Sequence, residues 1–265
     1  MRTRRAVDRS FSVFTWAVLG LLSAYISLIV ITLMAHVSVE SYGDTLLSGQ
    51  AFSTIRLSVI CATIASVLAL LFAVPIAYLL ARKNFPGKNL VDTILDIPIV
   101  LSPVALGTVL LVVLSSDAGK LFQDNLVSFT FAIPGIILAQ FTIVVALAIC
   151  SLKAVFEQIS PRYEEVAYFL GCNRWQTFLG ISLPLARTGI IASFILAWAR
   201  AIGEFGATIT VAGAVPGKTE TIPSAIYLGL AGVDIQGTLI YTLLLVFLAI
   251  VVLLGVRFLT AKRSG

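Results

Sequence analysis

The sequence predicts an all-α polytopic membrane protein with six transmembrane helices, and three observations support this fold class. Hydrophobic residues make up 59% of the 265 residues and charged residues only 12%, and the mean hydropathy is +1.04. These values lie outside the range of soluble domains. Apolar runs of about 20 residues, the length that crosses a bilayer as a helix, recur along the chain. Basic residues gather between alternate runs.

Six apolar runs are expected to form the spans of a single transmembrane domain that covers residues 1–265. The third run contains Pro98 and Pro103, for which a simple kink is the leading interpretation and a partly unwound helix the alternative. The fifth run is interrupted by Arg200 and Glu204. The expected spans are placed at about 12–35, 57–81, 95–116, 130–152, 188–211 and 235–258.

The positions of Lys and Arg predict the orientation. With six spans, both termini lie on one side, together with residues 160–184, and cytoplasmic segments are enriched in basic residues. We therefore expect a multi-pass protein of the cell membrane with cytoplasmic N- and C-termini. Its partners then include membrane lipid but not nucleic acid, because the net charge of +5 reflects topology. Fourteen of the 18 basic residues fall on the expected cytoplasmic side: Arg2, Arg4, Arg5, Arg9, Arg82, Lys83, Lys88, Lys153, Arg162, Arg174, Arg187, Arg257, Lys262 and Arg263.

The connector before the sixth span is too apolar for a solvated loop and too rich in Gly and Pro for a full span. We expect a short re-entrant helix at about residues 222–230, near Pro223. Residues 212–219 approach the phosphate-binding loop pattern, but Ala212 replaces its first glycine and no strand precedes them. The three cysteines are widely spaced. No catalytic residue, cofactor site or metal site is therefore expected in this chain.

Residues 160–184 form the longest polar stretch and read as two short amphipathic helices joined by a turn. Ser160 is expected to cap the first helix, and Gly171 to end it in the left-handed conformation. Asn173 and Gln176 have the spacing of a capping box for the second helix, which Pro184 is expected to end.

The apolar faces of these two helices need cover. Large apolar side chains are costly to leave in water, so we expect a partner to dock on those that the chain leaves exposed. The alternative is a loop that merely packs under its own bundle. The side chains concerned are Tyr163, Val166, Leu170, Trp175 and Phe178.

Arg200 and Glu204 are the charges deep within a span, and their spacing of four residues places them on one helical face. Intramembrane charges usually face a bundle interior or a water-filled path, so one interpretation is that they line the translocation path or its gate. The other is an ion pair that neutralises itself for packing. Gly203 and Gly206 would allow a neighbouring helix to approach closely.

The polar stretch resembles a family signature. Glu165-Val166-Ala167, then three residues, Gly171, nine residues and Ile181-x-Leu183-Pro184 match the E-A-A-x-x-x-G-x9-I-x-L-P pattern of type I ABC importer permeases, with Val166 in place of the first alanine. The resemblance implies that residues 160–184 form the cytoplasmic coupling helix, which docks into a groove of an ATPase subunit. It places Glu165, Val166, Ala167 and Gly171 at that contact.

A second resemblance concerns the substrate. Residues 199–208 (ARAIGEFGAT), followed by 216–219 (PGKT), 221–223 (TIP) and 225–227 (AIY), are similar to the molybdate/tungstate and sulfate permeases. This implies an oxyanion importer, molybdate or tungstate before sulfate. The expected complex is a homodimer with one alternating-access path at its axis, two cytoplasmic ATPase subunits that bind ATP and Mg, and an extracytoplasmic oxyanion-binding protein. The permease itself is not expected to be an enzyme.

The sequence also leaves two alternative functions open. The chain could serve as a permease for sulfate or another solute within the same class of importer. A different class is an ATP-independent secondary carrier, for which an inverted repeat would be the usual sign, and no clear internal repeat is present.

Overall fold

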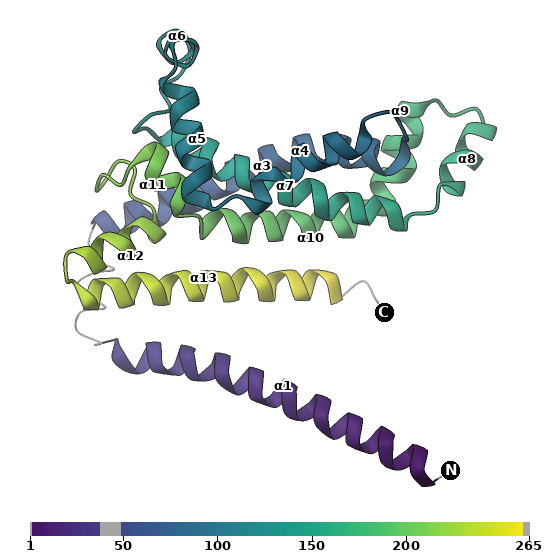
Figure 1. Cartoon of the computed structure of the whole chain (residues 1–265), viewed down its shortest axis with the longest axis horizontal. Helices are drawn as coiled ribbons and strands as arrows, with labels where there is room; N and C mark the ends of the chain where they lie inside the picture. Colours follow the sequence, from purple (N-terminus) through teal and green to yellow (C-terminus); the bar gives the residue numbers. More distant parts are fainter. Residues whose placement is uncertain (1, 38–48, 262–265) are drawn as a thin grey trace.

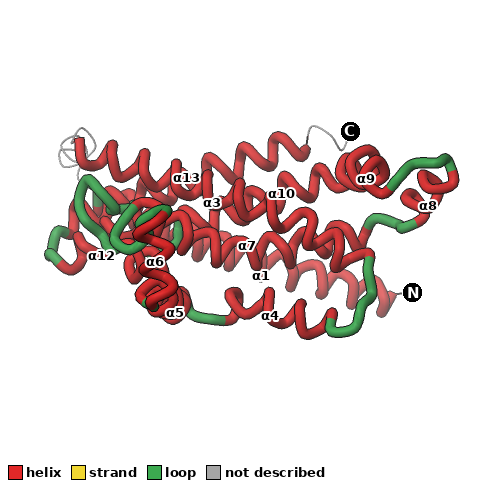
Figure 2. The backbone as a smooth tube through the Cα atoms, turned by 90° about the horizontal axis from the view of Figure 1, so that it is seen from above, coloured by secondary structure: helices red, strands yellow, loops and turns green. Residues whose placement is uncertain are grey.

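The computed structural model confirms the all-α fold: the described residues, 2–37 and 49–261, form helices and loops without a strand (Figure 2). Residues 1, 38–48 and 262–265, and the side chains of residues 2–10 and 256–261, lie outside the description. The terminal basic residues behind the predicted orientation are among them. The helices are α1 (Arg2–His36), α3 (Gly49–Arg82), α4 (Lys88–Val100), α5 (Pro103–Ser115), α6 (Asp117–Asn125), α7 (Ile133–Gln158), α8 (Arg162–Phe169), α9 (Arg174–Thr177), the π turn η1 (Phe178–Ser182), α10 (Leu183–Ile202), α11 (Gly206–Ala212), α12 (Ile222–Ala231) and α13 (Ile235–Ala261).

Five helices of the described chain are long and apolar enough to cross a membrane, and a sixth crossing is possible if α4 and α5 count as one. These two helices meet at 111° across residues 101–102, so a break precedes Pro103 where a simple kink was expected, whereas Pro98 lies within α4. Proline disfavours a helical conformation in the residue before it. Ser102 is accordingly extended, and its side chain accepts a hydrogen bond from the backbone N–H of Ala105, which starts α5 as a new helix.

The core of the bundle is built from α3, α7 and α10, which run side by side in Figure 1. Small side chains let these helices approach closely, as is common in membranes. The buried alanines of α3, for example Ala62, Ala69, Ala73 and Ala77, pack against apolar residues of α7 and α10. By contrast, α1 buries none of its described side chains and lies apart from this core in Figure 1.

The fifth expected span, 188–211, differs from the structure at both ends. The helix starts earlier and runs without interruption from Arg174 to Ile202, and residues 203–205 separate it from α11. The expectation that Pro184 ends a helix is wrong. The N–H of Leu183 donates to the carbonyl of Phe178, five residues back, and Pro184 then lies in the first turn of α10, where its missing N–H is tolerated.

The short helix expected at residues 222–230 is present as α12. Thr221 and Ser224 form its capping box, and the backbone N–H of Ile222 donates to Ser58 Oγ of α3 at 2.8 Å. In Figure 1 the chain turns from α12 directly into α13. Its re-entrant placement in a bilayer stays a prediction.

One close helix contact can be tested with a matched pair of substitutions. A Cβ on Gly107 of α5 would lie 2.7 Å from Ala207 Cα of α11, whereas a Cβ on Gly20 of α1 would meet nothing within 4 Å. Alanine is favoured over glycine in a helix by about 1 kcal/mol, but overpacking costs about 1–3 kcal/mol. We expect Gly107→Ala to lower the thermal unfolding midpoint in detergent and Gly20→Ala to leave or raise it. Equal shifts in the two variants would contradict this packing.

Candidate functional site

In residues 160–184, the turn between α8 and α9 is largely as expected. Gly171 has a φ of +88° and follows α8, and the N–H of Cys172 donates to the carbonyl of Ala167 at 3.0 Å. Asn173 and Gln176 form the expected capping box of α9. The cap expected from Ser160 is absent, because α8 begins after Pro161 without a side-chain cap hydrogen bond.

The apolar face of this segment points away from the protein. Phe169 is 90% exposed, Leu170 80% and Trp175 71%. Of the four residues expected at a partner contact, Glu165, Val166 and Gly171 are exposed and only Ala167 is buried.

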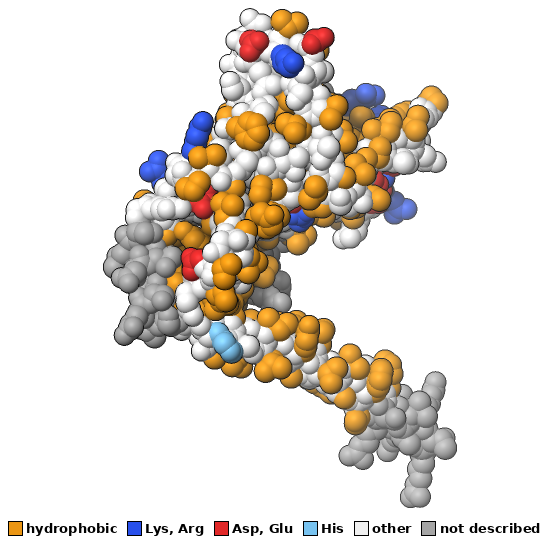
Figure 3. Space-filling model, turned by 60° about the vertical axis from the view of Figure 1, so that its left-hand side comes forward, with side chains coloured by type: hydrophobic (Ala, Val, Ile, Leu, Met, Phe, Trp, Pro, Cys, Tyr) orange, Lys and Arg blue, Asp and Glu red, His pale blue; other side chains and the backbone are white. Residues whose placement is uncertain are grey.

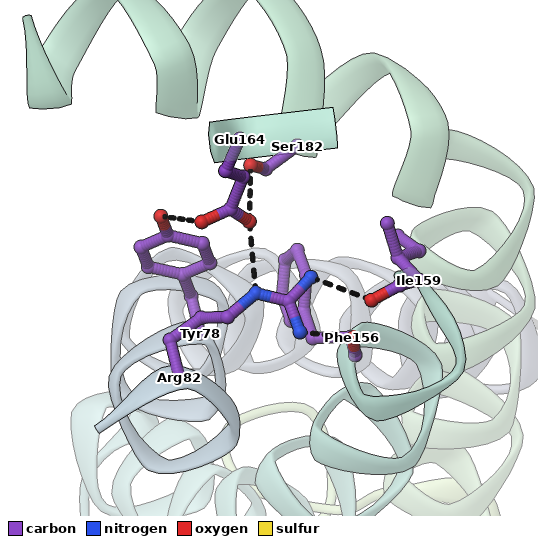
Figure 4. A network of polar contacts seen from close by, with 6 residues as sticks. All are labelled: Tyr78, Arg82, Phe156, Ile159, Glu164 and Ser182. Atoms are coloured by element: carbon purple, nitrogen blue, oxygen red, sulfur yellow. Dashed lines mark hydrogen bonds and ion pairs between the residues drawn. The ribbon is translucent and has the colours of Figure 1, made fainter. Parts of the chain in front are cut away.

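A buried carboxylate holds α8 against the bundle (Figure 4). Glu164 Oε1 accepts hydrogen bonds from Arg82 Nε and from Ser182 Oγ, both at 2.8 Å. Its Oε2 accepts one from the hydroxyl of Tyr78 at 2.9 Å. One side chain of α8 is thereby bound to α3 twice and to the π turn η1 once.

Arg82 extends this network to a third element. Its Nη1 donates to the carbonyl of Phe156 and its Nη2 to that of Ile159, each at 2.9 Å (Figure 4). Both carbonyls lie at the C-terminal end of α7, where the helix dipole places partial negative charge and favours a cation. The guanidinium of Arg82 therefore joins the ends of α3 and α7 and forms an ion pair with the carboxylate of Glu164.

The Glu164–Arg82 pair is desolvated, since their side chains are only 8% and 9% exposed. A buried ion pair contributes little over apolar packing, but removal of one partner leaves an uncompensated charge and costs about 3–5 kcal/mol. The pair therefore fixes the position of α8 strongly. We define Tyr78, Arg82, Glu164 and Ser182, with the two α7 carbonyls, as the Glu164 network.

The Glu164 network was not predicted from the sequence. The glutamate of the family signature is Glu165, which is exposed, whereas its neighbour Glu164 is buried and holds α8 to the bundle. One signal was available: Glu164 lies three residues before Ala167 and so shares its buried face. The position of Arg82, directly after an apolar span, was read only as a topology marker.

A second ion pair joins α4 to α7. Lys153 Nζ of α7 lies 2.7 Å from Asp92 Oδ2 of α4, and both side chains are partly exposed. Partly exposed pairs contribute at most about 1 kcal/mol, so this contact orients α4 more than it stabilises it.

Arg200 and Glu204 form an ion pair at the break between α10 and α11. Arg200 Nη1 lies 2.5 Å from Glu204 Oε2, and their side chains are 37% and 1% exposed. Glu204 is not on the helix with Arg200, since it lies in the non-helical residues 203–205. Its Oε1 accepts a hydrogen bond from the N–H of Ala207 at 3.1 Å, which places a carboxylate at the start of α11.

The two glycines beside Glu204 differ in their surroundings. A Cβ on Gly206 would lie 2.9 Å from Pro103 Cβ of α5, so this glycine allows the close approach that was expected. A Cβ on Gly203 would meet only the carbonyl of Ala199, at 3.7 Å. The start of α11 therefore packs directly on the start of α5, the helix that follows the break at residues 101–102.

No group of three or more His, Cys, Asp or Glu side chains that could hold a metal occurs among the residues that the structure describes. Residues 212–219, which approach the phosphate-binding loop pattern, begin at the last residue of the helix α11, where that loop requires a preceding strand.

The sequence matches the family model of the binding-protein-dependent transport system inner membrane component over residues 69–265. It is 34% identical to the sulfate transport system permease protein CysW of Synechococcus elongatus, over 98% of this chain and 93% of that protein. It is 37% identical to the molybdenum transport system permease protein ModB of Escherichia coli, over 69% of this chain and 81% of that protein. The molybdate/tungstate transport system permease protein WtpB of Thermococcus kodakarensis is 38% identical, over 77% and 79% respectively.

The fold is similar to a chain of a bacterial alginate ABC transporter that was solved with an alginate pentasaccharide-bound periplasmic protein. The TM-score is 0.74 at 18% identity, over 97% of this chain and 96% of that one.

The Glu164 network can be tested against its exposed neighbour. Glu164→Gln leaves the buried Arg82 uncompensated, so we expect faster backbone hydrogen exchange across residues 162–171 and a loss of about 3 kcal/mol in stability. Glu165→Gln, one residue away and exposed, should change neither measurement by more than about 0.5 kcal/mol. If both variants behaved alike, the network would not be what holds α8.

A double-mutant cycle tests the ion pair between Arg200 and Glu204. Arg200→Ala leaves a buried carboxylate unpaired, whereas Glu204→Ala leaves a cation that is partly exposed. We expect Arg200→Ala to have the lowest thermal midpoint in detergent, and the double variant to recover to the level of Glu204→Ala. Additive losses in the double variant would show that the two side chains do not interact.

Proposed function

The chain belongs to the family of binding-protein-dependent transport system inner membrane components, the permease subunits of type I ABC importers, and from this premise we propose that it imports a tetrahedral oxyanion. Molybdate or tungstate is the first candidate and sulfate the second. The two relatives named for molybdenum and for molybdate/tungstate have a slightly higher sequence identity to this chain than the sulfate permease CysW of Synechococcus elongatus, although they match a smaller share of the chain. The short motifs at 199–208 and 216–227 support the same class.

The proposed path lies at the axis of a homodimer. In support, α1 and α4 bury no described side chain against their own chain, so a large surface is available to a second copy. The break at residues 203–205 ends a spanning helix, and Arg200 beside it keeps over a third of its side chain exposed. A cation beside the path would ease the passage of an oxyanion, and pairing with Glu204 would keep it from binding tightly.

Coupling to a cytoplasmic ATPase is proposed to run through residues 160–184. The observation that carries this proposal is an exposed apolar face, containing Phe169, Leu170 and Trp175, on a segment that the Glu164 network holds rigidly. An exposed apolar patch on a fixed helix is typical of a partner interface. In this cycle the ATPases bind ATP and Mg, their closure brings the two coupling segments together, and the path opens toward the binding protein.

The interface can be tested without disturbing the fold. Phe169→Asp changes a side chain that is 90% exposed, so the chain should still fold, and a buried interface anchor is worth about 2 kcal/mol or more. We expect the ATPase to co-purify at least about tenfold less and transport to fall with it. Val215→Asp, exposed in the connector at the other end of the bundle, is the control and should retain both. Normal co-purification with Phe169→Asp would contradict the interface.

Reconstitution tests the function. Liposomes that contain this chain, its ATPase and its binding protein should accumulate molybdate or tungstate only with ATP, measured as metal by elemental mass spectrometry. Sulfate uptake without molybdate uptake would contradict the first candidate. Ion-gradient uptake by the chain alone would contradict the importer and support the secondary carrier. A requirement for a different second permease would contradict the homodimer.

A further inference from the structure

A cavity and a groove on one surface of α3 and α7 have no part in the proposed cycle. The cavity, of about 360 Å³, lies at the end of the bundle opposite α8. Arg56 of α3 and Lys218 and Glu220 of the connector line it, and Ile60 and Ile133 form part of its apolar wall.

The groove, of about 300 Å³, lies farther along the same two helices and is lined only by apolar side chains. Phe72 of α3 and Phe141 of α7 meet edge to face, with ring centroids 5.8 Å apart, at its far end. The lining consists of Ile64, Leu68, Phe72, Phe129, Pro134, Ile137, Leu138 and Phe141.

The cavity and the groove follow one another along one face of each helix. In α3 the lining residues recur three or four apart, at 53, 57, 60, 64 and 68, and in α7 they recur four apart, at 133, 137 and 141. From Ile60 to Phe72 the helix rises about 18 Å. This is close to one leaflet of a hydrocarbon core about 30 Å thick.

The charges are divided between the rim and the wall of the cavity. Arg56 and Lys218 are exposed and have no ion-pair partner among the described side chains. Figure 3, which turns this end of the molecule forward, shows Lys and Arg side chains beside apolar ones. Glu220 is only 5% exposed, and its Oε2 accepts hydrogen bonds from Gln50 Nε2 at 3.1 Å and Thr54 Oγ1 at 3.2 Å.

We propose that this surface binds one phospholipid with an amine headgroup. The phosphate lies between Arg56 and Lys218, the amine faces the Glu220 carboxylate, and one acyl chain fills the groove. Two cations with one carboxylate match a zwitterionic headgroup, and an apolar channel one leaflet long matches an acyl chain. The lipid thereby joins the connector, through Lys218, to the outside of α3 and α7. This site does not depend on which solute is transported.

Native mass spectrometry of the full chain, released from phosphatidylethanolamine nanodiscs, tests the site. The wild type should retain one lipid per chain. Arg56→Gln combined with Lys218→Gln should retain it about tenfold less, whereas Lys120→Gln on α6 should not change retention. Leu68→Trp, which fills the groove, should also displace the lipid, whereas Leu21→Trp on α1, where the side chain is 76% exposed, should not.

Three outcomes would overturn the proposal. Retention that is unchanged in the charge variant or in Leu68→Trp would show that the lipid is not held here. Equal retention of phosphatidylglycerol by the wild type would remove the role of Glu220 and of the amine. A chain-to-chain cross-link from a photoreactive residue at Leu68 would show that a second copy fills the groove instead.

Discussion

The buried pair between Glu164 and Arg82 is the contact on which the arrangement of residues 160–184 depends. Most apolar side chains of α8 face outward, and Glu164 and Ala167 are its only buried residues. Without the ion pair, α8 would have little to hold it to the bundle. With it, the eight residues of α8 are held to α3, to the end of α7 and to the π turn η1.

The helix that follows links the two candidate sites. It runs uninterrupted for 29 residues, from Arg174 to Ile202, which is a length of about 43 Å. Ser182 near its start belongs to the Glu164 network, and Arg200 near its end binds Glu204 at the break. In the proposed cycle, a displacement of residues 160–184 reaches the break through this one continuous helix. In the proposed cycle this helix carries the movement, and residues 203–205 absorb it.

Local rules predicted what depends on neighbouring residues in the sequence. The left-handed Gly171, the capping box at Asn173 and the short helix α12 all follow from such rules, and the apolar runs predicted the helical fold. The sequence did not predict features that depend on residues far apart. Glu164 is buried because Arg82, 82 residues away in the sequence, meets it, and the π turn that accommodates Pro184 accompanies that contact. Gly206, directly after the break at residues 203–205, packs on Pro103, directly after the break at 101–102, and the helical pattern of a single segment does not predict such a contact.

The distance between α8 and α3 during transport tests most directly whether the Glu164 network holds the two helices together. Spin labels at Val166 and at Leu71, both exposed, in a background with Cys61, Cys150 and Cys172 replaced by Ser, would report it by pulsed electron paramagnetic resonance. The assembled importer would be compared at rest and with ATP trapped. We expect the distance within one chain to stay the same in both states, and to change between states when Glu164 is replaced by Gln. A distance that changes in the unaltered protein would contradict rigid coupling through the Glu164 network.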